Sequence, residues 1–108
     1  MIEEGYTRTL VLGLARPLVL WLLHIKPRSG YELMSEIKRL TGMTLGPALI
    51  YPFLHALEKS DCIAGRWFER AGRKVRCYSI TRKGEAVLGG VRHLFRSPMK
   101  EMLLDLLR

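Results

Sequence analysis

A basic segment, residues 66–84, contains the side chains best suited to binding chemistry, and it reads RWFERAGRKVRCYSITRKG. Its residues alternate as they do in a β-hairpin. The segment has a single acid, Glu69, and its cations are Arg66, Arg70, Arg73, Lys74, Arg76, Arg82 and Lys83. Cations held this close together repel one another unless an anion relieves the repulsion. The segment therefore predicts an anionic partner. The alternative is a solvated hairpin with no partner, which more commonly carries both signs of charge.

The composition limits what that partner is. The chain has 108 residues, is 48% hydrophobic and carries a formal net charge of +8. The apolar content excludes a disordered basic tail, and the charge gives the molecule a strong positive field. Nucleic acid and an anionic membrane surface are the expected partners, and an acidic protein is the less common third.

The remaining polar residues form no pattern typical of an enzyme or a metal site. His24, His55 and His93 are isolated in the sequence, and there is no glycine-rich phosphate loop. Cys62 and Cys77 fit neither a zinc-ligand spacing nor a disulfide framework. We therefore expect reduced thiols in a cytoplasmic protein that is not an enzyme and has neither metal nor cofactor.

The most apolar run of the chain covers residues 10–25. A membrane-spanning helix needs about 20 apolar residues, and this run is shorter and has Arg16 and Pro17 at its middle. Glu3 and Glu4 precede the run and no small-residue cleavage site follows it, so it does not fit a signal peptide. The run predicts a helix that belongs to the folded protein.

This first helix is expected over residues 7–26, bent or restarted at Pro17 and stopped by Pro27. Its apolar residues cover almost the whole circumference, so the helix must be covered on all sides. A second copy of the chain is the expected cover for one side. The alternative is burial within a monomer.

Two shorter helices follow. Ser29 and Glu32 have the spacing of a capping box, which predicts a helix over residues 30–41. The segment GPALIYPFLHALEKSD, residues 46–61, starts a third helix, and Pro47 suits its first position. The short connection between the two helices has the length that a helix-turn-helix requires.

The basic segment predicts two strands, over residues 62–68 and 75–80, joined by a turn that contains Gly72. A further helix is expected over residues 81–95. After Ser97-Pro98 a last helix begins, and its apolar residues fall on one stripe.

This order of elements predicts a fold that is mainly α with a small β-hairpin, a winged helix-turn-helix. We expect one domain over residues 1–108, with a DNA-binding core at 17–84 and helical dimerisation extensions at 1–16 and 85–108. In this fold the third helix enters the major groove and the hairpin, or wing, follows the phosphate backbone. The cations of the wing then release condensed counterions from DNA.

Residues 17–88 resemble, in unbroken order, the PadR-like transcriptional regulators. The motifs that carry the resemblance are Gly30-Tyr31-Glu32-Leu33, then Tyr51-Pro52 with Leu54 and Leu57, then Tyr78, Ile80, Thr81 and Gly84. Two places depart from the family pattern. Asp61 replaces a glycine before the wing, and Ala48 and Leu49 replace Gly-Thr at the start of the third helix. The resemblance implies a cytoplasmic homodimer that binds operator DNA and dimerises through its first and C-terminal helices.

The predicted DNA contacts are Tyr51, His55, Lys59, Arg66, Arg70, Arg73, Lys74 and Arg76. Tyr51 is expected to touch a phosphate or sugar, or else to pack at the start of its helix. His55 is expected to reach a base edge or phosphate, or else to be a plain surface residue. The exposed face of the third helix has no Arg, Asn or Gln, so backbone and shape contacts are expected to dominate. Arg66 and Arg76 have an alternative place, against Glu69 on the outer face of the wing.

The predicted dimer interface consists of Leu14, Leu18, Trp21, Leu22, Phe95, Met99, Met102, Leu103 and Leu106. Many members of the family that the chain resembles bind small hydrophobic or phenolic ligands near this interface. Trp21, His93 and Phe95 are predicted to line such an effector pocket, with plain interfacial packing as the alternative.

We therefore expect a sequence-specific DNA-binding transcriptional regulator, a repressor that acts as a homodimer. The rival is a basic amphipathic module that binds a membrane surface or an acidic protein through its last helix. The polar face of that helix argues against the rival, because it carries Glu101 and Asp105 beside Lys100 and Arg108, whereas membrane-surface helices are rich in cations there.

Overall fold

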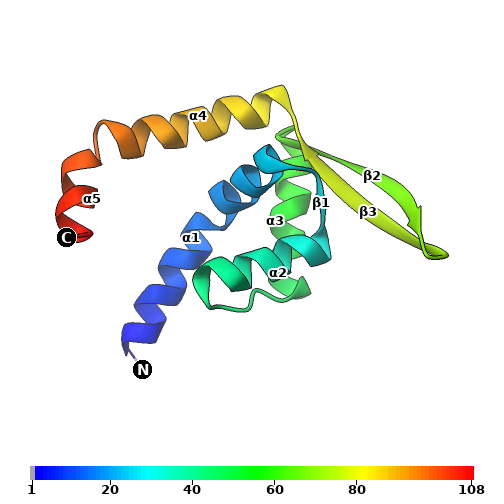
Figure 1. Cartoon of the computed structure of the whole chain (residues 1–108), viewed down its shortest axis with the longest axis horizontal. Coiled ribbons are helices and arrows are strands. Elements are labelled where there is room, and N and C mark those ends of the chain that lie inside the picture. Colours follow the sequence, from blue (N-terminus) through cyan, green and yellow to red (C-terminus); the bar gives the residue numbers. More distant parts are fainter. Residues whose placement is uncertain (1) are drawn as a thin grey trace.

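The computed structural model of the chain describes residues 2–108. The elements are, in order, α1 (Ile2–Ile25), β1 (Arg28–Ser29), α2 (Gly30–Thr41), α3 (Pro47–Lys59), β2 (Ile63–Arg70), β3 (Arg73–Ile80), α4 (Arg82–Arg96) and α5 (Lys100–Leu106). Figure 1 shows α1, α2 and α3 gathered in one body, with the β2–β3 hairpin projecting from one side and α4 and α5 reaching out on the other. This arrangement is a winged helix-turn-helix, as predicted.

Helix α1 runs without a break through Pro17 and supplies one side of the core. Val11, Ala15, Val19 and Leu22 recur at spacings of three and four residues and are buried. By length and composition alone this helix is apolar enough to cross a membrane. These four residues, however, pack in the core of the folded chain. The large apolar side chains that α1 leaves exposed are Tyr6, Leu10, Trp21 and Ile25.

Helices α2 and α3 pack on α1 and complete the core. The predicted capping box is present, since the Ser29 hydroxyl accepts from the Glu32 N–H and the Glu32 carboxylate accepts from the Ser29 N–H, each at 3.1 Å. The backbone hydrogen bond from Ser29 lowers the pKa of Glu32. Leu45, in the connection, is fully buried and ties the turn to the core. The other buried apolar side chains of these two helices are Leu33, Ile37, Ile50, Leu54 and Leu57.

Strands β2 and β3 form the wing. They pair antiparallel from Ile63 opposite Ile80 to Arg70 opposite Arg73. The turn consists of Ala71–Gly72 alone, with φ angles of 48° and 76°, which is the backbone of a two-residue type I′ hairpin. Each strand therefore runs two residues further toward the tip than predicted.

A third strand, β1, was not predicted. Arg28 and Ser29 pair with Tyr78 and Cys77, so the sheet order is β1-β3-β2 and β3 is central. Arg28 is only 7% exposed, and its Nε donates to the Leu22 carbonyl at 3.2 Å. This short strand therefore fixes the base of the wing to the end of α1.

Helix α4 packs directly on the start of the wing because Gly84 has no side chain. The Thr81 hydroxyl accepts from the Gly84 N–H at 3.1 Å and caps the helix, while the Thr81 N–H donates to the Cys62 carbonyl at 3.0 Å. A Cβ at Gly84 would collide with that carbonyl oxygen. Beyond this contact, α4 lies along α1, with Leu88 buried in the core, and leads to α5, which has no buried residue.

Candidate nucleic-acid interface

The outward face of α3 presents three of the predicted DNA contacts together. Tyr51, His55 and Lys59 follow one another at intervals of four residues, and all three are exposed. They therefore lie along one side of the helix, while Ile50, Leu54 and Leu57 hold its opposite side in the core.

Tyr51 has the packing role that was its predicted alternative, and its contact with a phosphate or sugar stays a prediction. Its ring packs against Gly30, where a Cβ would lie 2.9 Å from both the Cε1 and the hydroxyl of Tyr51. Tyr51 is nevertheless 45% exposed, and Tyr31 beside it is 74% exposed. Gly30 therefore holds the phenol at the start of α2, where the helix dipole favours an anion.

The alternation of the strands sorts the side chains of the wing onto two faces. Trp67 is opposite Arg76, and both lie on the face that turns toward α3. Arg66 is opposite Cys77 on the other face. Arg66 and Glu69 are three residues apart on one strand, so they point to opposite faces and the expected pairing between them is wrong.

Arg76 is engaged within the molecule. Its Nη2 donates to the Glu58 carboxylate at 2.7 Å, and its guanidinium carbon lies 5.4 Å from the Trp67 ring centroid and 5.8 Å from that of Tyr78. The hydrogen bond with Glu58 raises the pKa of Arg76, and burial raises the pKa of Tyr78. Arg76 was expected to contact DNA or to lie against Glu69, whereas it pairs with Glu58 and joins the wing to α3.

The cations at the wing tip differ in whether they form an ion pair with an acidic side chain. Nη1 of Arg70 lies 3.4 Å from Glu32, in a pair whose side chains are largely exposed. Arg73 and Lys74 are exposed, and no ion pair involves either of them within residues 2–108. Arg73 and Lys74 are therefore the positive charges of the tip that remain available to an external anion.

A groove of about 540 Å³ separates the wing from the starts of α2 and α3, and it is lined by aromatic and basic side chains. They include Tyr31, Tyr51, Trp67, Arg73, Lys74 and Tyr78. Neither Trp67 nor Tyr31 was among the predicted DNA contacts. Strand alternation links Trp67 to Arg76, but only once the length of the turn fixes the register. An aromatic and cationic groove of this kind suits a sugar–phosphate chain.

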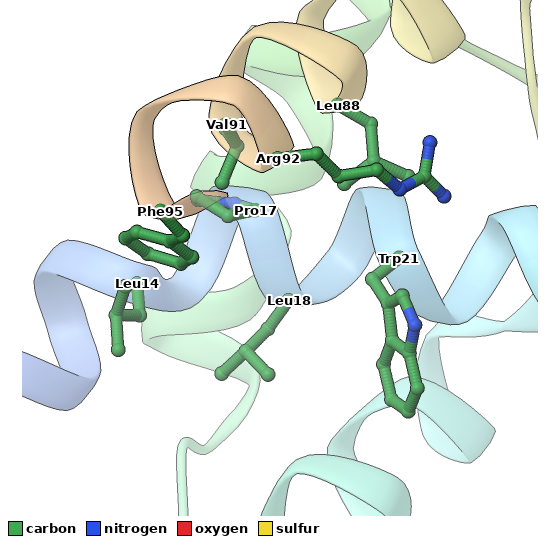
Figure 2. Close-up of a pocket in the computed structure, with 8 residues that line it drawn as sticks. All are labelled: Leu14, Pro17, Leu18, Trp21, Leu88, Val91, Arg92 and Phe95. Carbon is green, nitrogen blue, oxygen red and sulfur yellow. The ribbon is translucent and has the colours of Figure 1, made fainter. Parts of the chain in front are cut away.

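A second pocket, of about 240 Å³, lies between α1 and α4. Figure 2 shows the residues that line it, which are Leu14, Pro17, Leu18 and Trp21 of α1 and Leu88, Val91, Arg92 and Phe95 of α4. Trp21 and Phe95 thus line one pocket, as predicted. His93 is exposed and does not line it, so its predicted place there is wrong.

Leu14 and Leu18 line the same pocket, but Leu22, also predicted for the dimer interface, does not. It is 1% exposed and lies in the core of its own chain. Leu22 is therefore not available to a partner, because the inward side of α1 is already covered. Met99 and Leu103 are half-buried, and Met102 and Leu106 are exposed.

The comparison with known families decides the assignment. A model described as "Transcriptional regulator PadR-like family" matches residues 19–90. The chain belongs to the PadR-like family. The resemblance inferred for residues 17–88 is thereby confirmed. No curated protein matches the chain.

Solved PadR-like structures share the fold. A PadR family regulator from Eggerthella lenta is 24% identical, with a TM-score of 0.83 over 99% of this chain and 93% of that one. A PadR-like regulator from Bacillus cereus is also 24% identical, with a TM-score of 0.77 over 89% and 93%. Bacillus subtilis PadR, in complex with operator DNA, is 26% identical, with a TM-score of 0.64 over 69% of this chain and 44% of that one.

We predict that Glu58→Gln loosens the wing without unfolding the protein. The lost ion pair is part-exposed, so its contribution to the free energy of unfolding is small, about 0.5–1 kcal/mol. Hydrogen exchange of the β2 and β3 amides is expected to become faster. Asp105→Asn is the control, because Asp105 pairs with Arg108 on the surface of α5. Equal exchange in the two variants would show that the sheet alone holds the wing.

Proposed function

We propose that this PadR-like protein is a homodimeric repressor that binds duplex DNA sequence-specifically in the cytoplasm. Helix α3 enters the major groove, and the wing follows the phosphate backbone. The observation that carries the proposal is the groove that brings Tyr51 of α3 and the exposed Arg73 and Lys74 of the wing to one surface. Repression follows from the bound dimer, which occupies DNA that the transcription machinery needs.

The contacts within this surface divide the work of binding. Tyr51, Arg73 and Lys74 supply phosphate contacts, which fix the register of the protein on the duplex. His55 and Lys59 lie along α3 and reach toward base edges or phosphates. The structure of Bacillus subtilis PadR with operator DNA supports this use of the fold.

The dimer, in this proposal, is built by the extensions at residues 1–16 and 85–108 on either side of the DNA-binding core. No residue of α5 is fully buried within its own chain. Its exposed large apolar side chains are Met102, Leu104, Leu106 and Leu107. Apolar side chains gathered on one short helix are typical of a surface that another chain covers. If a second chain covers the apolar side chains of α5, this helix is not available to bind a membrane surface, which is the rival function.

Replacing Arg73 and Lys74 by Ala is predicted to weaken binding to all duplexes alike. For a dimer with two wings, log K against log salt should slope at roughly −4 to −8, at about −0.9 per phosphate contact. Removing four contacts should make the slope less steep by roughly 3–4. The measurement is fluorescence anisotropy of labelled duplex DNA at several salt concentrations.

The control for this measurement is Arg96→Ala with Lys100→Ala, which removes the same net charge from the exposed α4–α5 region. We expect it to leave the slope almost unchanged. If both double variants make the slope of log K against log salt less steep by the same amount, the wing does not contact phosphates specifically and the net charge alone attracts the DNA. If the wild type binds no duplex at low salt, the proposed function is wrong.

Met102→Gln with Leu106→Gln is predicted to convert a dimer into a monomer. Both side chains are exposed in the single chain, so their replacement should not affect its folding. Each replacement removes an apolar contact with the partner, on the order of 1.5–3 kcal/mol. The dissociation constant of the dimer should therefore rise more than tenfold for each side chain. Sedimentation equilibrium gives the mass. The control is Glu101→Gln with Asp105→Asn on the polar face. A wild-type chain that sediments as a monomer would contradict the proposal.

The pocket between α1 and α4 is proposed to take a small planar aromatic effector. Its walls are apolar except for Arg92, and it is the size of one or two rings. In a Trp67→Phe variant, the emission of Trp21 should change when 4-nitrophenol or 2-naphthol is added, and DNA affinity should change with it. A Trp21→Phe variant, which reports Trp67 instead, should not respond in this way. Unchanged emission and affinity would show that the pocket is plain interfacial packing.

A further inference from the structure

The face of α3 that is proposed to enter the major groove has an apolar centre. Ala48 and Pro52 are exposed and lie one turn apart, at positions i and i+4. Neither side chain has a hydrogen-bond donor or acceptor, and Pro52 also lacks a backbone N–H. Leu49 beside them is half-buried against the core. The part of α3 that faces outward near its start is therefore unable to make side-chain hydrogen bonds with bases.

The polar side chains of α3 lie around this centre. Tyr51 packs on Gly30, which draws its hydroxyl toward the start of α2. Glu58 is bound to Arg76. Lys59 is the last residue of the helix. Only His55, one turn beyond Pro52, adds an exposed polar group next to the apolar pair.

Base edges in the major groove differ in what they offer to such a surface. Thymine carries a C5-methyl group there beside its O4 acceptor, whereas adenine, guanine and cytosine present hydrogen-bonding groups and no methyl. An apolar side chain placed against those groups leaves them without partners, which is unfavourable. Against a thymine methyl, the same side chain removes apolar surface from water. Apolar contact is thus the readout that suits Ala48 and Pro52.

We infer that Ala48 and Pro52 are specificity-determining residues that read thymine C5-methyl groups in each operator half-site. This inference rests on the proposed function, because it needs α3 in the major groove. The operator carries thymines at the base pairs below the first turn of α3, and His55 addresses a neighbouring base pair.

The experiment begins with the full-length protein and a library of duplexes that have a random 20-base-pair core. Duplexes enriched by several rounds of binding are resynthesised with uracil in place of thymine at one position at a time. This change removes the C5-methyl and keeps every hydrogen-bonding group. At one or two thymines of each half-site we expect affinity to fall about fourfold, the value of one buried methyl group. Elsewhere the change should be less than twofold.

Two protein variants assign the effect. Ala48→Gly removes the one methyl of Ala48, and Pro52→Ala removes most of the Pro52 ring while favouring the helix. Each variant should bind the thymine duplex more weakly and lose sensitivity to uracil at its own position. His55→Ala is the matched control on the same face. It should bind more weakly to thymine and uracil duplexes alike and keep the fourfold difference.

Each other outcome is decisive. If a sequence is enriched but uracil is tolerated at every position, DNA binding stands and the methyl readout is wrong. If the uracil effect persists unchanged in both variants, another part of the protein or the shape of the DNA reads the methyl groups. If no sequence is enriched and no duplex binds, the proposed function fails and the inference fails with it.

Discussion

The ion pair between Arg76 and Glu58 joins the wing to α3, and the geometry of the candidate interface depends on it. The wing carries many cations, and their mutual repulsion favours its bending away from the body. Arg76 opposes this because its guanidinium meets a carboxylate of α3 and two aromatic rings of the sheet. This ion pair and the pairing of β1 with β3 together position the exposed side chains of the tip relative to α3.

The same arrangement separates structural charges from binding charges. Arg28 and Arg76 belong to the structural group, because each has a short contact with its own chain. Arg73 and Lys74 lie nearer the tip than the Arg76–Glu58 ion pair, where a two-residue turn exposes them to solvent. Phosphate contacts from these two residues cost no internal ion pair. The excess of cations in the sequence thus consists of two groups. One group stabilises the fold, and the other is exposed and available to bind an anion.

Local signals in the sequence predicted the elements well, and tertiary contacts account for what they missed. The capping box at Ser29 and the proline at the start of α3 act within one turn, so α2 and α3 begin where they were predicted to begin. The pairing of Arg76 with Glu58 links residues 18 apart in the chain, and the register that brings Trp67 beside Arg76 depends on the length of the turn. Ala71 has a positive φ that its residue type does not favour, so the tight turn was not evident.

The apolar circumference of α1 shows the same limit and leads to a functional consequence. Sequence periodicity indicated that α1 needs cover on all sides, but not that Leu22 faces the monomer core while Leu14 and Leu18 face α4. One helix therefore supports the core beneath α3 on one side and lines the α1–α4 pocket on the other. In the proposed dimer, built by the first and last helices, a ligand in that pocket would contact α1 and α4 at once and so act on helices that carry the dimer interface.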